Sequence, residues 1–251
     1  MPDIFKEVGI IILAAGKGKR LNCNDNPKVL YKIGGQSLIS YILATLNSAR
    51  IIKENICLVV GFQAEKVKEI IGPGYIYALQ KECLGTAHAA RTGEKVLPEN
   101  IKTILVLNGD DSAFYKFSSL NNFVSEHLKN NCDISLLTCE PADPQGLGRV
   151  VRDENNKVSA IVEKENMTEE LKKIKEISTG TFCIKRSWFK KYYNNLKLIP
   201  NLGELGMPSF IGEALKYKAN FEAIKLADPN EWFGVNTREQ LEEADRRKRE
   251  E

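Results

Sequence analysis

The sequence predicts an α/β protein in which helices flank a mostly parallel, mixed β-sheet. Short apolar runs alternate with segments of helical spacing, which is typical of parallel strands joined by right-handed crossovers. A glycine-rich loop follows the first apolar run directly, as at the ligand edge of such sheets. The 251 residues, of which 43% are hydrophobic and 27% charged, are enough to build one large core.

Strands and helices alternate through the first half of the chain. The apolar runs predict buried strands at 8–12, 56–60, 75–79 and 101–107. Helical spacing predicts helices at 64–71, 86–96 and 118–129, and a further helix that carries Leu38, Ile39, Ile42 and Leu46 on one face. Ser37 is placed to cap that helix.

The second half is more irregular. A strand is predicted at 133–139 and a hairpin from 149–151 and 158–162. Helical patterns return near 187–194 and 211–216 and after Thr237, which can form a capping box with Gln240. No internal repeat or low-complexity linker interrupts the chain, so we expect a single domain over residues 1–251.

Composition excludes several classes of function. A net charge of +3 is too mild for general nucleic-acid binding, no apolar run reaches the length of a membrane span, and the N-terminus has no signal-peptide pattern. Six scattered cysteines without a Cys-x-x-Cys pair favour a reducing cytoplasm over a disulfide framework or a zinc site. We therefore expect small-molecule substrates and no nucleic-acid or membrane partner; nothing in the sequence sets the oligomeric state.

A basic, glycine-rich loop is the most informative motif. It runs Leu13-Ala14-Ala15-Gly16-Lys17-Gly18-Lys19-Arg20 and is followed by Pro27-Lys28-Val29-Leu30. Small residues and glycines let the backbone turn tightly and expose N–H groups, and the cationic side chains favour phosphates. The spacing is not that of a P-loop, and Leu21 stands where the dinucleotide fingerprint requires a third glycine.

Two further strings follow predicted strands. Gln80 offers the donor and acceptor needed to pair with a base, and Gly85 and Thr86 leave room for a base or ribose. Asp110, in the string Leu107-Asn108-Gly109-Asp110-Asp111, supplies a carboxylate that suits Mg²⁺ at the carboxyl end of a strand. His88 is expected to pack behind the site.

Together these strings resemble the sugar-nucleotide pyrophosphorylases, a family of nucleotidyltransferases. The Pro27–Leu30 continuation is most similar to the uridyltransferase domain of bacterial N-acetylglucosamine-1-phosphate uridyltransferase. The resemblance implies the Rossmann-like nucleotide-diphospho-sugar transferase fold. It also implies Mg²⁺-dependent conversion of UTP and a sugar 1-phosphate, N-acetylglucosamine 1-phosphate or a related sugar, to a UDP-sugar and pyrophosphate. Residues 1–112 would then form the nucleotide half, and residues 113–251 the sugar-phosphate half with the C-terminal helix.

The resemblance also implies residue roles. The catalytic residues would be Arg20, Lys28 and Lys164, and the metal ligands Asp110 and the Asn236 of Gly234-Val235-Asn236. The nucleotide would contact Leu13, Ala14, Ala15, Gly16, Gly18, Gln80, Gly85 and Thr86, and the sugar Gly109, Gly148, Glu163 and Ser178.

Three departures from the family pattern leave alternatives open. Ser178 replaces the sugar-contacting Asn, the segment 203–209 differs from Gly-Glu-Tyr-Tyr-Leu-Thr-Asp, and Asp111 replaces an apolar residue and is expected to face solvent rather than to add charge beside the metal. A cytidylyl- or other nucleotidyltransferase acting on a different sugar or polyol phosphate, and a non-catalytic sensor of the same fold, remain open. The hexapeptide repeats of the family's acetyltransferase domain are absent, so acetyl transfer is not expected of this sequence.

Overall fold

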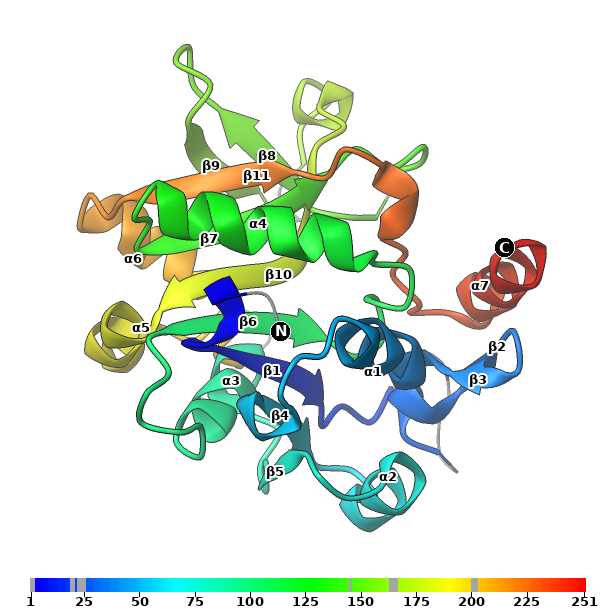
Figure 1. Ribbon diagram of the computed structural model, residues 1–251. Coiled ribbons are helices and arrows are strands. Elements are labelled where there is room, and N and C mark those ends of the chain that lie inside the picture. Colours follow the sequence, from blue (N-terminus) through cyan, green and yellow to red (C-terminus); the bar gives the residue numbers. More distant parts are fainter. Residues whose placement is uncertain (1–2, 19–20, 22–25, 145, 163–166, 200–202) are drawn as a thin grey trace.

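A seven-stranded sheet forms the centre of the computed structural model, which describes residues 3–18, 21, 26–144, 146–162, 167–199 and 203–251 (Figure 1). Its strands are β1 (Val8–Ala14), β4 (Ile56–Val60), β5 (Ile76–Leu79), β6 (Thr103–Asn108), β7 (Ile134–Cys139), β10 (Ile177–Lys185) and β11 (Phe221–Lys225). Two small hairpins lie outside it, β2 (Lys32–Ile33) with β3 (Gln36–Ser37) and β8 (Arg149–Arg152) with β9 (Val158–Val162).

The order of strands in the sheet is β11-β7-β10-β6-β1-β4-β5. Neighbours pair in parallel except where β10 runs antiparallel between β6 and β7. This mostly parallel mixed sheet confirms the predicted fold class. Because β1, β4, β5 and β6 run in one direction, their carboxyl ends lie at one edge of the sheet.

Helices cover both faces of the sheet. One face packs against α1 (Leu38–Ser48), α2 (Ala64–Ile71) and α4 (Phe117–Lys129), and the other against α3 (Thr86–Glu94), α5 (Arg186–Tyr192) and α6 (Ser209–Lys216). Residues of β1 alternate between the two layers, with Ile10 and Ile12 in one and Ile11 and Leu13 in the other. Burial on both faces explains why this strand is an unbroken apolar run.

The C-terminal helix α7 (Arg238–Glu250) lies beside the β2–β3 hairpin, on the side of the sheet where β1 and β6 end (Figure 1). It begins with the predicted capping box, in which the Thr237 hydroxyl accepts from the Gln240 N–H and the Gln240 side chain accepts from the Thr237 N–H. Farther along, Asp245 accepts a hydrogen bond from the Gly34 N–H at 2.8 Å. This docking holds the residue before the cap, Asn236, at the sheet edge.

Two local features differ from the sequence-based expectations. Strands β10 and β11 were not predicted, because Ser, Thr and Gly interrupt the apolar pattern of the first and the second is a half-buried edge strand. Ser37 does precede α1, but its hydroxyl contacts the Ser40 hydroxyl instead of capping a backbone N–H.

In the described part of the chain, no helix is both long and apolar enough to cross a membrane.

A buried histidine in α4 makes stability depend on pH. His127 is 1% exposed, and its Nδ1 lies 2.8 Å from the Ser135 hydroxyl. Burial, aided by the charge of Lys185 and opposed by that of Asp133, lowers the pKa of His127 from 6.5 to about 4. The unfolded chain therefore binds a proton between these values that the folded chain does not, so stability falls as the pH falls through this range.

We expect the His127→Gln variant to lose less stability on acidification than the native protein. Between pH 7 and pH 4.5 the difference should reach about 2.5 kcal/mol, since this range covers most of the shift in the pKa of His127 and each pKa unit corresponds to about 1.4 kcal/mol. Urea denaturation at pH 7 and pH 4.5 measures it. Parallel loss of stability in both proteins would contradict a role for this imidazole.

Candidate active site

The glycine-rich loop begins at the carboxyl end of β1, and its first residues are buried. Leu13, Ala14 and Ala15 are buried, whereas Gly16 is exposed. The Leu13 carbonyl accepts from the Gly109 N–H at 3.0 Å, which ties the loop to the end of β6. Gly18 has a φ of +64°, a conformation that glycine adopts without strain. The loop thus offers an exposed backbone turn at the ligand edge of the sheet.

Three residues from distant segments converge beside this loop. Lys28 lies in the single helical turn Lys28–Leu30 after Pro27, and its side chain is 11% exposed. Its ammonium forms an ion pair with Asp110 and donates a hydrogen bond to Asn236 Oδ1 at 3.0 Å. Lys28 is one of the three catalytic cations that the sequence analysis predicted, and Asp110 and Asn236 are the two predicted metal ligands.

The donor set fits a magnesium ion. The Asp110 carboxylate and the Asn236 amide oxygen are hard oxygen ligands, and both reach the same ammonium. No cluster of three or more His, Cys, Asp or Glu side chains with metal-ligating geometry occurs among the described residues. Mg²⁺ is commonly held by one or two protein oxygens together with water and substrate phosphates. The arrangement therefore suits a metal bound jointly with a phosphorylated substrate.

Asp111 is half-buried as a residue, but its carboxyl is turned inward and its Oδ1 is buried, so the expectation that this carboxylate faces solvent is wrong. Its Oδ2 accepts a hydrogen bond from Asn108 Nδ2 at 3.1 Å, and its buried Oδ1 has no partner in the described part of the chain. Burial, with the neighbouring charge of Asp110, raises the pKa of Asp111 well above its ordinary value. The Asn108 amide supplies the donor that this buried carboxyl needs, a partner that the residue order alone does not reveal.

The predicted base-binding turn lies between β5 and α3. Gln80 is 5% exposed, and its Nε2 donates to the Gly85 carbonyl at 3.1 Å and lies 3.0 Å from His88 Nδ1. His88 thus packs against Gln80. The hydrogen bond from the Gln80 side chain to the Gly85 carbonyl thus stabilises the turn between β5 and α3.

A segment that the sequence analysis assigned to the sugar side contacts this turn instead. The Thr86 hydroxyl accepts from the Met207 N–H at 2.8 Å, and the Ala87 N–H donates to the Leu205 carbonyl at 2.8 Å. At Gly85, a Cβ would lie 2.4 Å from that carbonyl oxygen. Gly85 is therefore required by packing against Leu205, a contact for which the sequence carries no signal.

Three predicted sugar residues, Gly109, Gly148 and Ser178, are among the described residues, and each lies at or next to the end of a strand. Ser178 begins the irregular part of β10, where its hydroxyl accepts from the Gly180 N–H at 3.2 Å. Gly109 is packed closely, since a Cβ there would lie 3.0 Å from the Leu13 carbonyl oxygen. Gly148 is half-buried just before β8. Ser178 and Gly109 therefore have structural roles that do not depend on a ligand.

A hollow of about 220 Å³ lies beside Asn236. It is bounded by the segment that leads to Gly148 and by the start of α7. Its lining includes Pro141, Leu147, Trp232, Phe233, Gln240 and Arg247. Aromatic and polar side chains next to a candidate metal ligand make it a candidate space for part of the acceptor.

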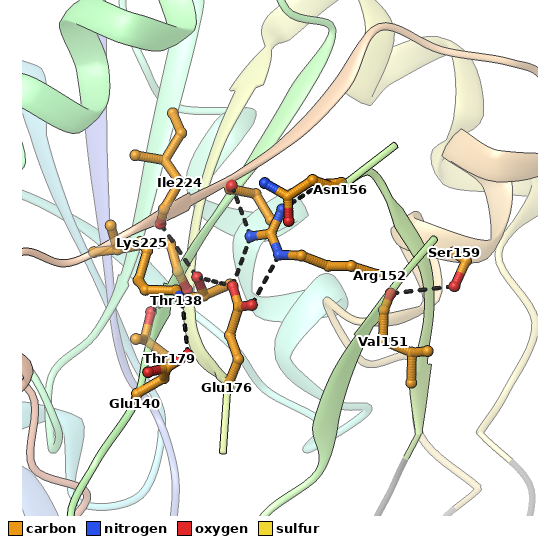
Figure 2. A network of polar contacts seen from close by, with 12 residues as sticks. Thr138, Glu140, Val151, Arg152, Asn156, Ser159, Glu176, Thr179, Ile224 and Lys225 are labelled. Carbon is orange, nitrogen blue, oxygen red and sulfur yellow. Dashed lines mark hydrogen bonds and ion pairs between the residues drawn. The ribbon is translucent and has the colours of Figure 1, made fainter. Parts of the chain in front are cut away.

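The hairpin that follows Gly148 is fastened to the sheet by a polar network (Figure 2). Arg152 pairs with Glu176 at 2.6 Å and donates to the Ala223 carbonyl at 3.1 Å, and the Thr138 hydroxyl donates to Glu176 at 2.6 Å. Burial raises the pKa of Glu176, but the hydrogen bonds from Arg152 and Thr138 outweigh it and hold the pKa below its ordinary value. The network joins β7, β8 and β11 through Glu176, the residue before β10, and sequence analysis did not find it because its members are far apart in the chain.

Three predicted site residues, Arg20, Glu163 and Lys164, lie outside the described residues. The structure thus brings Lys28, Asp110 and Asn236 into contact. Gln80, Gly85 and Thr86 follow the end of β5, Ser178 pairs with Thr138 near the carboxyl end of β7, and Gly148 precedes the separate β8–β9 hairpin.

Gly16 allows a test of ligand contact that is separate from folding. None of the described residues would lie within 4 Å of a Cβ at this position, and the φ of Gly16 is not in the left-handed region. We expect Gly16→Ala to change the free energy of unfolding by less than about 0.5 kcal/mol. It should raise the KM for the nucleotide, because the methyl group would occupy space beside the phosphates. Gly212→Ala, equally unobstructed but in α6, is the matched control, and equal KM values for both variants would contradict the assignment.

Comparison with known proteins agrees with this geometry. A model of the nucleotidyl transferase family matches residues 9–248. The chain is 35% identical over 239 residues to "Bifunctional protein GlmU" of Thermosipho africanus, and 35% identical over 237 residues to the protein of that name from Limosilactobacillus fermentum. These alignments cover 95% and 93% of this chain but 50% of each relative, so the chain spans about half the length of the curated relatives it matches.

A solved structure shares the fold. It is described as a glucose-1-phosphate thymidylyltransferase from Bacillus anthracis in complex with a sucrose. The match has a TM-score of 0.78 at 22% sequence identity and covers 97% of this chain and 96% of that chain. At this identity the likeness bears on the fold alone.

Proposed function

The chain belongs to the nucleotidyl transferase family, and from this premise we propose that it transfers a uridylyl group from UTP to a sugar 1-phosphate with the help of Mg²⁺. The family membership confirms the resemblance drawn from the motifs. The proposed products are a UDP-sugar and pyrophosphate, and the proposed acceptor is N-acetylglucosamine 1-phosphate or a related sugar 1-phosphate.

One observation carries the proposal. Lys28, Asp110 and Asn236, which come from three separate segments, meet at the carboxyl edge of the sheet beside an exposed glycine-rich turn. A cation, two hard oxygen ligands and an exposed glycine-rich backbone are what a triphosphate and its metal require. Ligands of open α/β sheets bind at this edge.

The proposed reaction asks for positioning and charge neutralisation more than for covalent chemistry by the protein. An oxygen of the acceptor phosphate attacks the α-phosphorus in line, and the bond to pyrophosphate breaks on the opposite side. Lys28, and Arg20 by resemblance, would neutralise charge on the α-phosphate and the leaving pyrophosphate. Asp110 and Asn236 would hold the Mg²⁺, which supplies further neutralisation of phosphate charge when bound. Lys164, again by resemblance, would orient the attacking phosphate.

Each half of the chain would bind one of the two substrates. Residues 1–112 contain the glycine-rich loop and the Gln80 turn, and we assign them to the nucleotide. Residues 113–251 contain Ser178 and the hairpin after Gly148, and we assign them to the sugar phosphate. UTP is supported by the resemblance of the Gln80–Thr86 string to uridyltransferase domains, and the assignment of Glu163 to the sugar rests on the same resemblance.

Pyrophosphate release tests the proposal. UTP, dTTP, CTP and GTP would each be combined with a panel of sugar 1-phosphates in the presence of Mg²⁺. We expect release with UTP and N-acetylglucosamine 1-phosphate or a related sugar. Absence of release with every pair, while nucleotides still bind, would contradict it and favour a non-catalytic sensor.

One contact favours a second candidate, a nucleotidyltransferase with another base preference. Segment 203–209, which departs from the family pattern, packs on the predicted base-binding turn through Leu205 and Met207. A change there can shift Gly85 and Thr86 and with them the choice of nucleotide. Release with dTTP, CTP or GTP but not UTP would select this candidate.

We also propose that the protein acts in the cytoplasm. The described cysteines Cys57, Cys83, Cys132, Cys139 and Cys183 are all free thiols. Free thiols, most of them buried, suit a reducing compartment. Labelling of the intact, unreduced protein from its native cells with a thiol reagent under denaturing conditions should modify these thiols fully.

A further inference from the structure

We propose that Lys28 takes the place of the metal ion in the substrate-free protein, so that a divalent cation binds only after the ammonium has left Asp110 and Asn236. The inference rests on the proposed function, in which these two residues hold Mg²⁺. It adds an exchange of cations at one position, which couples metal binding to nucleotide binding.

The contacts of the ammonium carry the inference. Its Nζ forms an ion pair with Asp110 Oδ2 and donates to Asn236 Oδ1 at 3.0 Å. The side chain of Lys28 is 11% exposed and that of Asp110 is 25% exposed, so water has limited access to the pair. A single positive group thus engages both oxygens of the candidate metal site.

An ammonium and a divalent cation cannot share these oxygens. Mg²⁺ requires ligand oxygens at about 2.0–2.1 Å in near-octahedral geometry, which leaves no room for a second cation between the same two groups. The two positive charges would also repel each other strongly at a site partly shielded from water. A metal ion that arrives alone must therefore break the Lys28 contacts before it binds.

A bound nucleotide would give the displaced Lys28 ammonium a new negatively charged partner. The triphosphate brings negative charge to which a displaced Lys28 can bind, and the flexible four-carbon stem of lysine allows the ammonium to move while the backbone stays in place. The backbone of this segment is held by the helical turn after Pro27 and by buried Val29 and Leu30. Metal and nucleotide would each make the other's site available, which is positive coupling between ligands.

The test measures metal binding without any substrate. Mn²⁺ serves as the probe, and its free concentration is followed by electron paramagnetic resonance during titration of the intact protein. We expect Lys28→Met to bind Mn²⁺ about tenfold more tightly than the native protein, within the usual range for coupling between ligands. Lys28→Arg keeps the charge and should leave the affinity weak.

A matched variant separates exchange from a general effect of charge. Lys32→Met removes the same charge four residues away, from an exposed side chain of β2, and should leave Mn²⁺ affinity unchanged. Circular dichroism establishes that each variant is folded, and Lys28→Gln, which conserves a polar end group, replaces Lys28→Met if the latter is not.

Two results would overturn the inference. Equal Mn²⁺ affinity in Lys28→Met and the native protein would show that the lysine does not compete with the metal. Equal tightening by Lys32→Met would assign the effect to net charge. Because no substrate is present, either result can occur whether or not the native protein releases pyrophosphate, so failure of this inference is distinguishable from failure of the proposed function.

Discussion

Replacement of Asp110 by asparagine is expected to lower kcat on the order of 10³-fold, the size of loss found when a group that stabilises developing phosphate or oxyanion charge is removed. Asp110 is the only carboxylate paired with Lys28 in the described part of the chain. An amide at this position would keep the shape of the side chain but would neither hold Mg²⁺ as tightly nor balance the lysine charge.

The adjacent carboxyl provides the control for this experiment. Asp111 has the same side chain, but its Oδ1 is buried and its Oδ2 is hydrogen-bonded to Asn108 instead of to Lys28. We expect Asp111→Asn to retain most of its turnover, because asparagine can still accept the hydrogen bond from the Asn108 amide. Steady-state pyrophosphate release by both variants measures the difference, and similar losses would withdraw the assignment of Asp110 as the metal ligand.

Much of the fold could be predicted because its central strands are buried on both faces. β1 and β4 are continuous apolar runs, since helices cover both sides of the sheet, and such runs are recognised without knowledge of their partners. β10 escaped recognition for the opposite reason. Its Thr179 and Thr181 are buried and satisfied by the Leu137 carbonyl and the Tyr115 hydroxyl, contacts that exist only once the sheet has formed.

In the candidate site, too, local patterns predicted some features, whereas others depend on contacts that form only in the folded protein. Positions directly after strands, such as Asp110 and Gln80, could be placed at the ligand edge because all parallel strands end there. The contact between Lys28 and Asn236 joins residues 208 positions apart and depends on the docking of α7 against the β2–β3 hairpin. The motifs predicted that both residues act at the site, but only tertiary packing brings the ammonium onto the amide oxygen.

Replacement of Gly85 by alanine is expected to be among the most damaging single changes to stability. Gly85 has φ 102° and ψ 176°, a region that is almost exclusive to glycine. A Cβ there would also lie 2.4 Å from the backbone carbonyl oxygen of Leu205, which cannot move aside as a flexible side chain can. Backbone strain of about 1–3 kcal/mol and overpacking of about 1–3 kcal/mol together predict a loss of about 4 kcal/mol.

Gly72 supplies a matched control for the two contributions. Its φ of 86° and ψ of −176° lie in the same region as those of Gly85, but no atom of the described part of the chain would lie within 4 Å of a Cβ there. Gly72→Ala should therefore lose only the backbone share, about 1–3 kcal/mol, in urea denaturation.

The KM for the nucleotide separates the two glycines in a second way. Because Gln80 donates to the Gly85 carbonyl, displacement of residue 85 should move the Gln80 amide and raise this KM, whereas Gly72→Ala should leave it unchanged. Equal stability losses in the two variants would mean that the Leu205 contact does not constrain the turn. An unchanged KM for the nucleotide in Gly85→Ala would instead mean that this turn takes no part in nucleotide recognition.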